Sequence, residues 1–261
     1  MIKAITPTNI IDKDKMKYIL ESTESHNISL HLLGVGKEFK FLSKIFWFAE
    51  YLNMHHTYED KTIIVYTDAY DVFYIKGLED IKKSFVSLNK DIIFSSERCY
   101  WHQLDKDKPF YDKLGKYKDY RYLNTGGVIG YAGALRNFFN DLIKLLDTNW
   151  FNLYIANEDS NFNGNRVKWG DDYIDQMIIS HYITRSLDIY NVGLDYNADI
   201  FYTPVEDWDE WDNEKNPNFT FSEDGLQLHR TESSPCIVHV PALPGRLPML
   251  EHLYRGIYED R

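Results

Sequence analysis

The sequence predicts an α/β protein in which a mixed, mainly parallel β-sheet is flanked by helices. Three observations indicate this fold class. Strand-like and helix-like segments alternate through the first half of the chain, as in proteins built from β-α-β units. The run TIIVYT at 62–67 is almost continuously apolar, which is typical of a strand covered on both faces. With 261 residues, 44% of them hydrophobic, the chain can form one large core, and we expect a single domain over 1–261.

The first half of the chain predicts strands and helices in alternation, each indicated by its apolar pattern. The strands are expected at 3–6, 28–33, 62–67 and 91–96, and the helices at 12–25, 41–52 and 78–88. The helix at 12–25 has an acidic start, which favours a helix N-terminus. Gly34 and Gly36 interrupt the second strand, but they lack the third glycine of a dinucleotide-binding fingerprint and are weak evidence for such a site.

The second half of the chain has a less regular pattern. The segment YLNTGGVIGYAG at 122–133 predicts a short strand, a tight glycine turn and another strand. Helices are expected at 134–147 and 173–183, loops at 157–172 and 205–218, and a final strand at 236–241. The sequence contains no internal repeat and no clear linker, which favours one α/β domain.

Composition excludes several classes of protein. The formal net charge is -11 and no cluster of Lys and Arg is present, so we expect no nucleic-acid partner. No apolar run approaches the roughly 20 residues needed to cross a bilayer, and the N-terminus lacks a signal-peptide core. We therefore expect a soluble protein, cytoplasmic by default. Cys99 and Cys236 are too few for a disulfide scaffold; two reduced thiols are expected, and a single bridge is the alternative.

Two carboxylates, Asp68 and Asp71, stand where the buried strand at 62–67 should end. Ligands of open parallel sheets bind at the carboxyl ends of the strands. Two ionised carboxylates this close repel each other unless a cation lies between them, and oxygen ligands suit Mg²⁺ or Mn²⁺. The pair therefore predicts a metal–diphosphate site. The alternatives are two solvated turn residues, or a metal-dependent phosphohydrolase with an Asp nucleophile, although such enzymes usually place one residue between the aspartates.

His239 is a candidate third ligand, because CIVHVP places it at the end of another apolar strand. A single histidine at a strand end is more often structural. We expect it to join the aspartates only if the strand at 236–240 lies beside the strand at 62–67.

Eight stretches, taken in their order, resemble the glycosyltransferase domain of the procollagen-lysine hydroxylase multifunctional enzymes and their collagen-glycosyltransferase relatives. They are LLGVGKEF, KIFWFAEYL, VYTDAYDV, FSSERCYW, YLNTGGVIGYA, DDYIDQ, LDYNADIF and IVHVPALPGR. The resemblance implies a GT-A-like, Rossmann-type fold, a nucleotide-sugar donor and Mn²⁺, with Mg²⁺ as an alternative. The transferase fills the chain, so no hydroxylase domain is expected. A composition rich in Ile, Asn, Lys, Asp and Tyr is typical of an AT-rich genome, such as that of a giant virus.

The resemblance also implies roles for individual residues. The implied metal ligands are Asp68, Asp71 and His239; the implied donor-binding residues are Thr6, Lys44, Trp47, Tyr70, Gly126, Gly127 and Arg246; and the implied catalytic residues are Asp175, Glu97, Asn124 and Trp101. The residue types are compatible with these roles: glycines let backbone approach a ligand, and an amide side chain can donate to and accept from a sugar hydroxyl. Each also has a structural alternative, such as packing for Trp101, a turn for the glycines and a surface charge for Glu97.

The expected activity is a Mn²⁺-dependent, retaining transfer of glucose from UDP-glucose to galactosyl-hydroxylysine of a collagen-like acceptor polypeptide. Asp175 is our choice for the carboxylate that stabilises the oxocarbenium-like transition state. The alternatives are an inverting UDP-galactose:hydroxylysine galactosyltransferase, a metal-dependent phosphohydrolase, and a sugar-binding protein without turnover.

Overall fold

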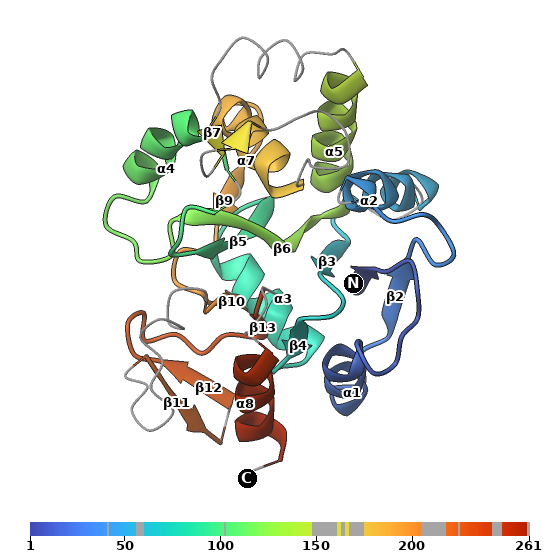
Figure 1. Ribbon diagram of the computed structural model, residues 1–261, viewed down its shortest axis with the longest axis vertical. Coiled ribbons are helices and arrows are strands. Elements are labelled where there is room, and N and C mark those ends of the chain that lie inside the picture. The colour runs from blue at the N-terminus through green and yellow to red at the C-terminus, as the bar shows by residue number, and fades with distance from the viewer. Residues whose placement is uncertain are drawn as a thin grey trace.

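The protein is described by a computed structural model. It covers residues 1–40, 42–55, 60–101, 103–147, 161–162, 165–166, 175–204, 218–223, 225–241 and 247–259. Within these residues the central element is a six-stranded sheet in the order β2-β1-β3-β6-β5-β9 (Figure 1). Its strands are β1 (Ile2–Pro7), β2 (Leu30–Leu33), β3 (Ile63–Thr67), β5 (Ile92–Glu97), β6 (Tyr122–Tyr131) and β9 (Val192–Leu194).

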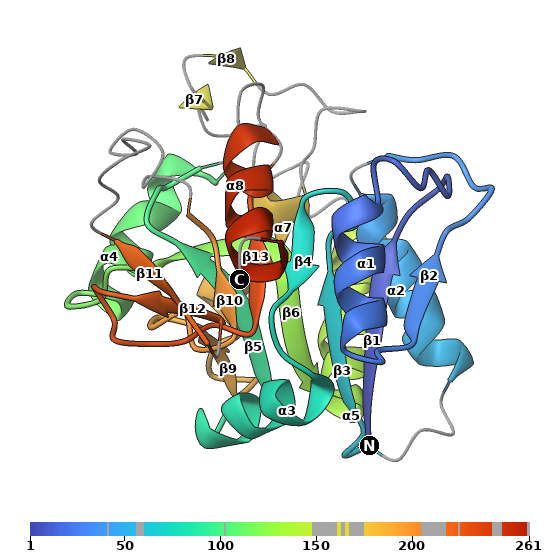
Figure 2. The same cartoon turned by 90° about the horizontal axis from the view of Figure 1, so that it is seen from below.

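The central sheet is mixed and mostly parallel, which confirms the predicted fold class. β1 is parallel to both β2 and β3, and β5 is parallel to β9. β6 runs antiparallel to β3 and β5, which lie on either side of it. In Figure 2 the N-terminus lies at the bottom and β1 runs upward, so the loops that follow β1 and β3 lie together at the top.

Helices cover both faces of the sheet, because side chains alternate between two apolar clusters along each strand. They are α1 (Lys17–Ser25), α2 (Ser43–Met54), α3 (Leu78–Ser87), α4 (Lys108–Leu114), α5 (Ala132–Asp147), α7 (Asp175–Ser186) and α8 (Leu247–Tyr258). On β3, Ile64 and Tyr66 face the cluster formed with α2, α5 and α7. Ile63 and Val65 face the other cluster, formed with α1 and α3. The two layers of helices lie above and below the sheet in Figure 1.

The predicted strand–turn–strand at 122–133 is wrong: β6 is a single ten-residue strand followed directly by α5. Gly126 and Gly127 lie within this strand, and Gly127 pairs with Thr67 of β3. Their role is close packing. A Cβ on Gly126 would lie 2.0 Å from the ring of His239, and one on Gly127 would lie 2.6 Å from the ring of Phe201. The register with β5 shifts between Phe94 and Ser95, so the strand is bent and not broken.

A second sheet of three short strands places the C-terminal part of the chain beside the first half. Its order is β10 (Phe201–Tyr202), β13 (Ile237–His239) and β4 (Val72–Tyr74). The expectation that the strand of His239 must lie beside 62–67 is wrong, because β13 pairs antiparallel with β4, and His239 is opposite Val72. β4 directly follows Asp71, so this pairing brings the histidine to the aspartates.

Further elements complete the described chain. They are the 3₁₀ turn at Asp105–Asp107, the hairpin of β11 (Phe219–Ser222) and β12 (Gly225–Leu228), and the short pair β7 (Asn161–Phe162) and β8 (Asn165–Arg166). α8 packs on a third apolar cluster with β4, β10 and β12. Cys99 and Cys236 are both free, so the alternative of a single bridge is wrong. No helix in the described ranges combines the length and apolar character needed to cross a membrane.

Candidate active site

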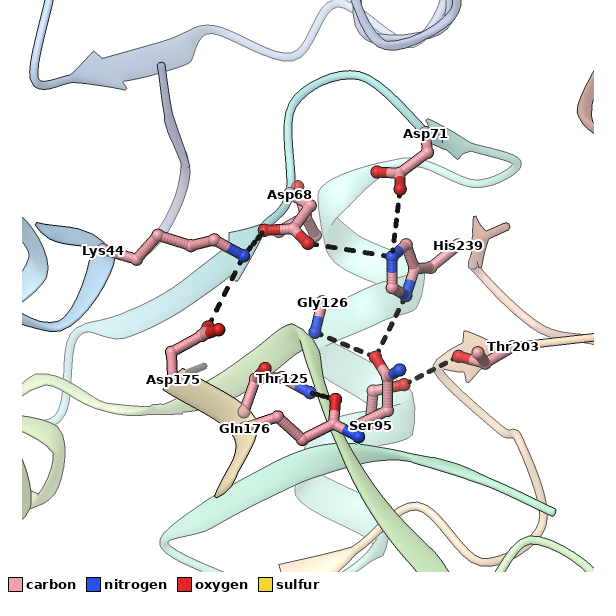
Figure 3. A network of polar contacts seen from close by, with 12 residues as sticks. Lys44, Asp68, Asp71, Ser95, Thr125, Gly126, Asp175, Gln176, Thr203 and His239 are labelled. Atoms are coloured by element: carbon pink, nitrogen blue, oxygen red, sulfur yellow. Dashed lines mark hydrogen bonds and ion pairs between the residues drawn. The ribbon is translucent and has the colours of Figure 1, made fainter. Parts of the chain in front are cut away.

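Asp68, Asp71 and His239 meet at the carboxyl end of β3 (Figure 3). Asp68 comes directly after β3, Asp71 directly before β4, and His239 is the last residue of β13. The Nε2 atom of His239 lies 3.6 Å from Oδ2 of Asp71 and 3.8 Å from Oδ2 of Asp68. Both contacts lie within ion-pair distance for a protonated imidazole, and the three side chains surround a shared point. One nitrogen and two carboxylate oxygens suit Mn²⁺ or Mg²⁺, so the site fits a divalent cation.

The contacts of His239 fix which ring nitrogen faces the aspartates. Its Nδ1 lies 3.0 Å from Oδ1 of Asn124, and the N–H of Gly126 donates to the same oxygen at 2.9 Å. An amide oxygen only accepts hydrogen bonds, so Nδ1 carries the hydrogen and Nε2 is left to hold a cation. This is the second layer of contacts by which proteins orient metal-binding histidines. The oxygen of Asn124 therefore holds the histidine, whereas the amide was expected from the sequence to contact a sugar hydroxyl through its donor and acceptor groups.

Lys44 lies at the boundary between the cluster and Asp175. Its Nζ is 2.8 Å from Oδ1 of Asp68 and 3.5 Å from Oδ2 of Asp175. Burial alone would lower the pKa of this ammonium, but the charges of Asp175 and Asp68 outweigh burial and hold the pKa above its usual value. Lys44 is therefore charged, and it ties together carboxylates from β3 and α7.

The local electrostatics leave negative charge in excess. Within the described part of the chain, the carboxylates of Asp68, Asp71 and Asp175 lie near the ammonium of Lys44 and the imidazole of His239, which is cationic only when protonated. Burial raises the pKa of Asp68, and the charge of Lys44 only partly opposes this. Burial lowers the pKa of His239, but the negative charges of Asp71 and Asp68 raise it above its usual value. Burial is thus the main cause of the Asp68 shift, and neighbouring carboxylates cause the His239 shift; a bound cation would favour the deprotonated form of both groups.

Gln176 on α7 has three hydrogen-bond partners, on β6, on β5 and in the segment after β5, and these contacts were not predicted from the sequence. Its Oε1 accepts from the backbone N–H of Thr125 at 3.2 Å. Its Nε2 donates to Oε1 of Glu97 at 2.8 Å and to the backbone carbonyl of Trp101 at 2.9 Å. Glu97 is buried, with 2% of its surface exposed, and the amide of Gln176 provides a hydrogen bond to its carboxylate there. Trp101 is partly exposed. Gln176 thereby fixes the first turn of α7, and with it Asp175, against β5 and β6.

The remaining donor-binding predictions fall in different environments. Thr6 is fully buried, and its hydroxyl donates to the backbone carbonyl of Thr67 at 2.8 Å. Trp47 is 7% exposed and packs on Gly34, where a Cβ would lie 2.3 Å from the indole ring. Tyr70 is 37% exposed, and its hydroxyl lies 2.9 Å from Oγ1 of Thr8. Thr6 and Trp47 are thus buried packing residues. The side chain of Tyr70, which lies between Asp68 and Asp71 in the sequence, is exposed.

The structure brings together the three metal-ligand candidates with Lys44, Asn124, Gly126 and Asp175, and it places Gly127 beside them in β6. Arg246, which was expected to contact the diphosphate, lies outside the described residues.

Comparison with known proteins assigns the family. The model of the family described as PLOD GT domain matches residues 7–155, which is more than half of the 261-residue chain. Procollagen-lysine,2-oxoglutarate 5-dioxygenase 2 of Mus musculus is 26% identical over 204 residues, covering 73% of this chain and 23% of that protein. Multifunctional procollagen lysine hydroxylase and glycosyltransferase LH3 of Rattus norvegicus is 30% identical over 125 residues, covering 44% and 16%.

Among solved structures, one that matches over 97% of this chain is a glycosyltransferase. It is described as a glycosyltransferase involved in the glycosylation of the major capsid of PBCV-1, with 12% sequence identity and a TM-score of 0.49, and the match covers 97% of this chain and 98% of that one. The chain corresponds to less than a quarter of the length of the two curated relatives, at 23% and 16%. By the match over 7–155, the chain belongs to the PLOD GT domain family, a family of glycosyltransferase domains.

Proposed function

We propose that this chain is a Mn²⁺-dependent glycosyltransferase that moves glucose from UDP-glucose to galactosyl-hydroxylysine of collagen-like chains, with retention of configuration. The observation that carries the proposal is the convergence of Asp68, Asp71 and His239, whose ligand atoms lie within 4.8 Å of one another. The acceptor is proposed from the names of the relatives, which are procollagen lysine hydroxylases and a procollagen lysine hydroxylase and glycosyltransferase.

The donor diphosphate is proposed to bind beside this cluster. A divalent cation held there supplies Lewis-acid stabilisation for the negative charge of the departing UDP. Asp68 and Asp71 offer carboxylate oxygens, and His239 offers Nε2 because Asn124 occupies its Nδ1. The ammonium of Lys44, 2.8 Å from Asp68, adds a fixed positive charge at the same edge of the sheet.

Asp175 is the carboxylate proposed to face the sugar. It is 3% exposed and lies on the opposite side of Lys44 from Asp68, at 3.5 Å from the ammonium. A sugar whose diphosphate lies at the cation would carry developing positive charge near this carboxylate, which stabilises an oxocarbenium-like transition state. The partly exposed ring of Trp101 offers a surface on which a sugar can stack.

The stereochemistry follows from the proposed substrates. UDP-glucose is an α-glycoside, and glucose on galactosyl-hydroxylysine is α-linked, so the reaction retains configuration. UDP-galactose is also α, whereas galactose on hydroxylysine is β-linked, so that alternative reaction inverts. The linkage in the product therefore distinguishes the two donors.

The test measures UDP release from UDP-glucose and UDP-galactose, with and without hydroxylysine and galactosyl-hydroxylysine peptides, in the presence of Mn²⁺. We expect UDP release that depends on the galactosyl peptide and on UDP-glucose, with an α-linked product identified from its anomeric proton coupling by NMR. β-Linked galactose on bare hydroxylysine as the main product would overturn the glucosyl assignment. Release of inorganic phosphate alone would overturn the transferase assignment, and so would no turnover of any UDP-sugar.

The assay needs a variant that separates chemistry at the cluster from a general effect of removing a carboxylate. Asp68→Asn removes one ligand charge while keeping the size of the side chain. Asp119→Asn is the matched control, because Asp119 is exposed on the surface. The proposal requires the first variant to lose transfer and the second to keep it.

A further inference from the structure

A polar pocket lies between helix α3 and the β11–β12 hairpin, outside the candidate active site. Its volume, counted as the space open to the centre of a water molecule, is about 500 Å³, which is large enough for a small ligand. The side chains that line it are all polar or charged: Lys76, Asp80, Lys83, Ser84, Ser87, Ser222, Gln227 and Ser234. Because no apolar side chain of the described residues lines the pocket, the ligand that fits it is strongly hydrophilic.

The two walls of the pocket follow from the residue pattern of their elements. The four lining residues on α3 are spaced i, i+3, i+4 and i+7, so they share one face of the helix. On β12, Gln227 lies between Leu226 and Leu228, which are buried in the third apolar cluster. Because side chains alternate along a strand, Gln227 points away from that cluster and lines the pocket.

The pocket lies at the end of the β4–β13 pair that is remote from the cation cluster. Lys76 follows β4 by two residues and Ser234 precedes β13 by three, whereas Asp71 and His239 are at the other ends of these strands. The Nζ atom of Lys76 donates to the backbone carbonyl of Ser234 at 2.7 Å, which fixes this lysine at the pocket wall. In Figure 2, α3 lies at the lower edge of the molecule, and the loops that follow β1 and β3 lie at the top. The pocket is therefore separate from the candidate active site.

Three side chains of the pocket have hydrogen-bonding capacity that the protein leaves unused. Within the described part of the chain, the side chains of Asp80, Lys83 and Gln227 make no hydrogen bond or ion pair. Asp80 and Lys83 are exposed and Gln227 is partly exposed, so a ligand can reach all three. Together they offer a carboxylate that accepts, an ammonium that donates and an amide that does both.

This mixture of donors and acceptors distinguishes between hydrophilic ligands. A simple anion such as phosphate would be attracted by Lys76 and Lys83 but repelled by the carboxylate of Asp80. A sugar hydroxyl both donates and accepts, so the several hydroxyls of one sugar ring can use the carboxylate, the ammonium, the amide and the serine hydroxyls together. No aromatic side chain of the described residues lines the pocket, so binding would depend on these hydrogen bonds and not on stacking.

We propose that this pocket is a second carbohydrate-binding site, which holds a neutral saccharide that does not react. Asp80 and Lys83 bind its hydroxyls from the side of α3, and Gln227 binds them from the side of the hairpin. The inference goes beyond the proposed transfer reaction and does not depend on it, because the pocket shares no lining residue with the cation cluster.

The test is an NMR titration in which the backbone amide signals are followed while D-glucose, D-galactose or inorganic phosphate is added. The double variant Asp80→Ala/Lys83→Ala removes two side chains of the pocket. The matched control is Glu79→Ala/Lys82→Ala, because these residues lie on the same helix and form an ion pair with each other outside the pocket lining. Each double variant loses one carboxylate and one ammonium, so both keep the net charge of the wild type. All four side chains are at least partly exposed, so both variants are expected to fold.

We expect at least one of the two sugars to shift the amide signals of α3 and β12, with a Kd of about 1–10 mM. The affinity should fall at least about tenfold in Asp80→Ala/Lys83→Ala, because hydrogen bonds to charged groups are lost, and should stay within about twofold of wild type in the control.

Three results would each overturn the inference. The first is no shift of these amide signals by either sugar up to about 50 mM. The second is equal sugar affinity in the wild type and in Asp80→Ala/Lys83→Ala. The third is a shift of the same signals by phosphate at a lower concentration than by the sugars, which would make the pocket an anion site. Because the titration requires no turnover, failure of the proposed transfer reaction is a separate result from failure of this one.

Discussion

Two aspartates, Asp68 and Asp195, directly follow buried strands of the same sheet, but the structure uses them in opposite ways. Asp195 follows β9 and is fully buried. Its carboxylate accepts three backbone hydrogen bonds, from Asp199 at 2.9 Å, Ile200 at 2.8 Å and Phe201 at 2.7 Å. Asp68 follows β3, and its carboxylate faces the ammonium of Lys44 and the imidazole of His239.

The difference separates a carboxylate that builds the fold from one that serves a site. Asp195 closes the turn between β9 and β10, and each of its hydrogen bonds satisfies a backbone N–H. Among the described residues, Asp68 stands beside the carboxylates of Asp71 and Asp175, and it contacts the ammonium of Lys44 and the imidazole of His239. A buried group left electrostatically unbalanced in this way is a mark of a functional site. An aspartate that follows a buried strand can therefore be structural or functional, and the groups that its carboxylate contacts indicate which role it has.

The largest contrast is expected in activity. Asp68→Asn should lower sugar transfer by about 1,000-fold, because it removes a charge from the site proposed to hold the cation and the donor diphosphate. Its free energy of unfolding should stay within about 1 kcal/mol of wild type, because relief of carboxylate repulsion offsets the lost contact with Lys44. Kinetics and urea unfolding of the same preparation measure both. If the Asp68→Asn variant transferred sugar at the wild-type rate at limiting Mn²⁺, Asp68 would not be a functional carboxylate.

The opposite pattern is expected at the turn. Asp195→Ala should lower the free energy of unfolding by about 3 kcal/mol or more, because three backbone N–H groups, two of them buried, lose their acceptor. Urea unfolding followed by circular dichroism gives this value, and Asp119→Ala on the exposed surface is the control. A loss below about 1 kcal/mol would mean that water or other groups satisfy the turn, and Asp195 would then not be a structural carboxylate.

A smaller effect is expected from the amide that orients the histidine. Asn124→Ala removes the acceptor of Nδ1 of His239, so the imidazole is free to change tautomer and to rotate. Mn²⁺ affinity should fall about 10-fold to 100-fold, as is usual when the outer partner of a metal ligand is removed. Isothermal titration with Mn²⁺, in the presence of UDP, measures the change. Equal affinities for wild type and variant would return Asn124 to a packing role.

The dependence of stability on pH gives a further comparison between Asp68 and Asp195. Burial raises the pKa of Asp195 to about 7, and it also raises the pKa of Asp68. The pKa of His239 is raised too, because the charges of Asp71 and Asp68 outweigh its burial. A raised folded-state pKa contributes stability that is present below the unfolded-state pKa and is lost as pH rises through the folded value. The metal-free protein should therefore lose stability as pH rises towards and above neutrality.

A cation reverses this trend at the site but not at the turn. The proposed Mn²⁺ ligands Asp68 and His239 must be deprotonated to bind the metal, so the rise in melting temperature on adding Mn²⁺ should grow with pH. Its midpoint should lie above about 6.5, the value of an unperturbed imidazole. The metal-dependent difference isolates the site, because Asp195 titrates with and without Mn²⁺. A melting-temperature difference that does not vary between pH 5.5 and 8.5 would contradict the assignment of His239 as a ligand.

Much of the sheet could be predicted because long apolar runs carry a clear period. The expected strands at 62–67 and 91–96 agree with β3 and β5 to within one residue. The turn predicted at 126–127 was wrong. Two adjacent glycines are a strong turn signal in a sequence, but Gly126 and Gly127 lie in a strand, where the rings of His239 and Phe201 leave no room for a side chain. The strands β4 and β10 have three and two residues and are too short to show a period. The helix α8 was not predicted, although its sequence has apolar residues at helical spacing: Leu250, Leu253 and Ile257 lie on its buried face.

The site was predictable in part for a related reason. Asp68 and Asp71 stand three residues apart at a strand end, and that position, together with the repulsion between two carboxylates, predicted a cation site. His239 could not be placed from its own strand, because its approach depends on the pairing of β13 with β4, which are far apart in the sequence. The contacts of Gln176 depend on how the first turn of α7 meets the end of β5. Such tertiary contacts leave no periodic signal in the chain.

The central claim is that Asp68, Asp71 and His239 hold the cation that binds the donor diphosphate. Crystals grown with Mn²⁺ and UDP, measured near the manganese absorption edge, test it most directly through an anomalous difference map. The account predicts one strong peak bonded to a carboxylate oxygen of each aspartate and to Nε2 of His239, with the diphosphate on its open side. Bound UDP with no peak at these three residues, or with the manganese held elsewhere, would contradict it.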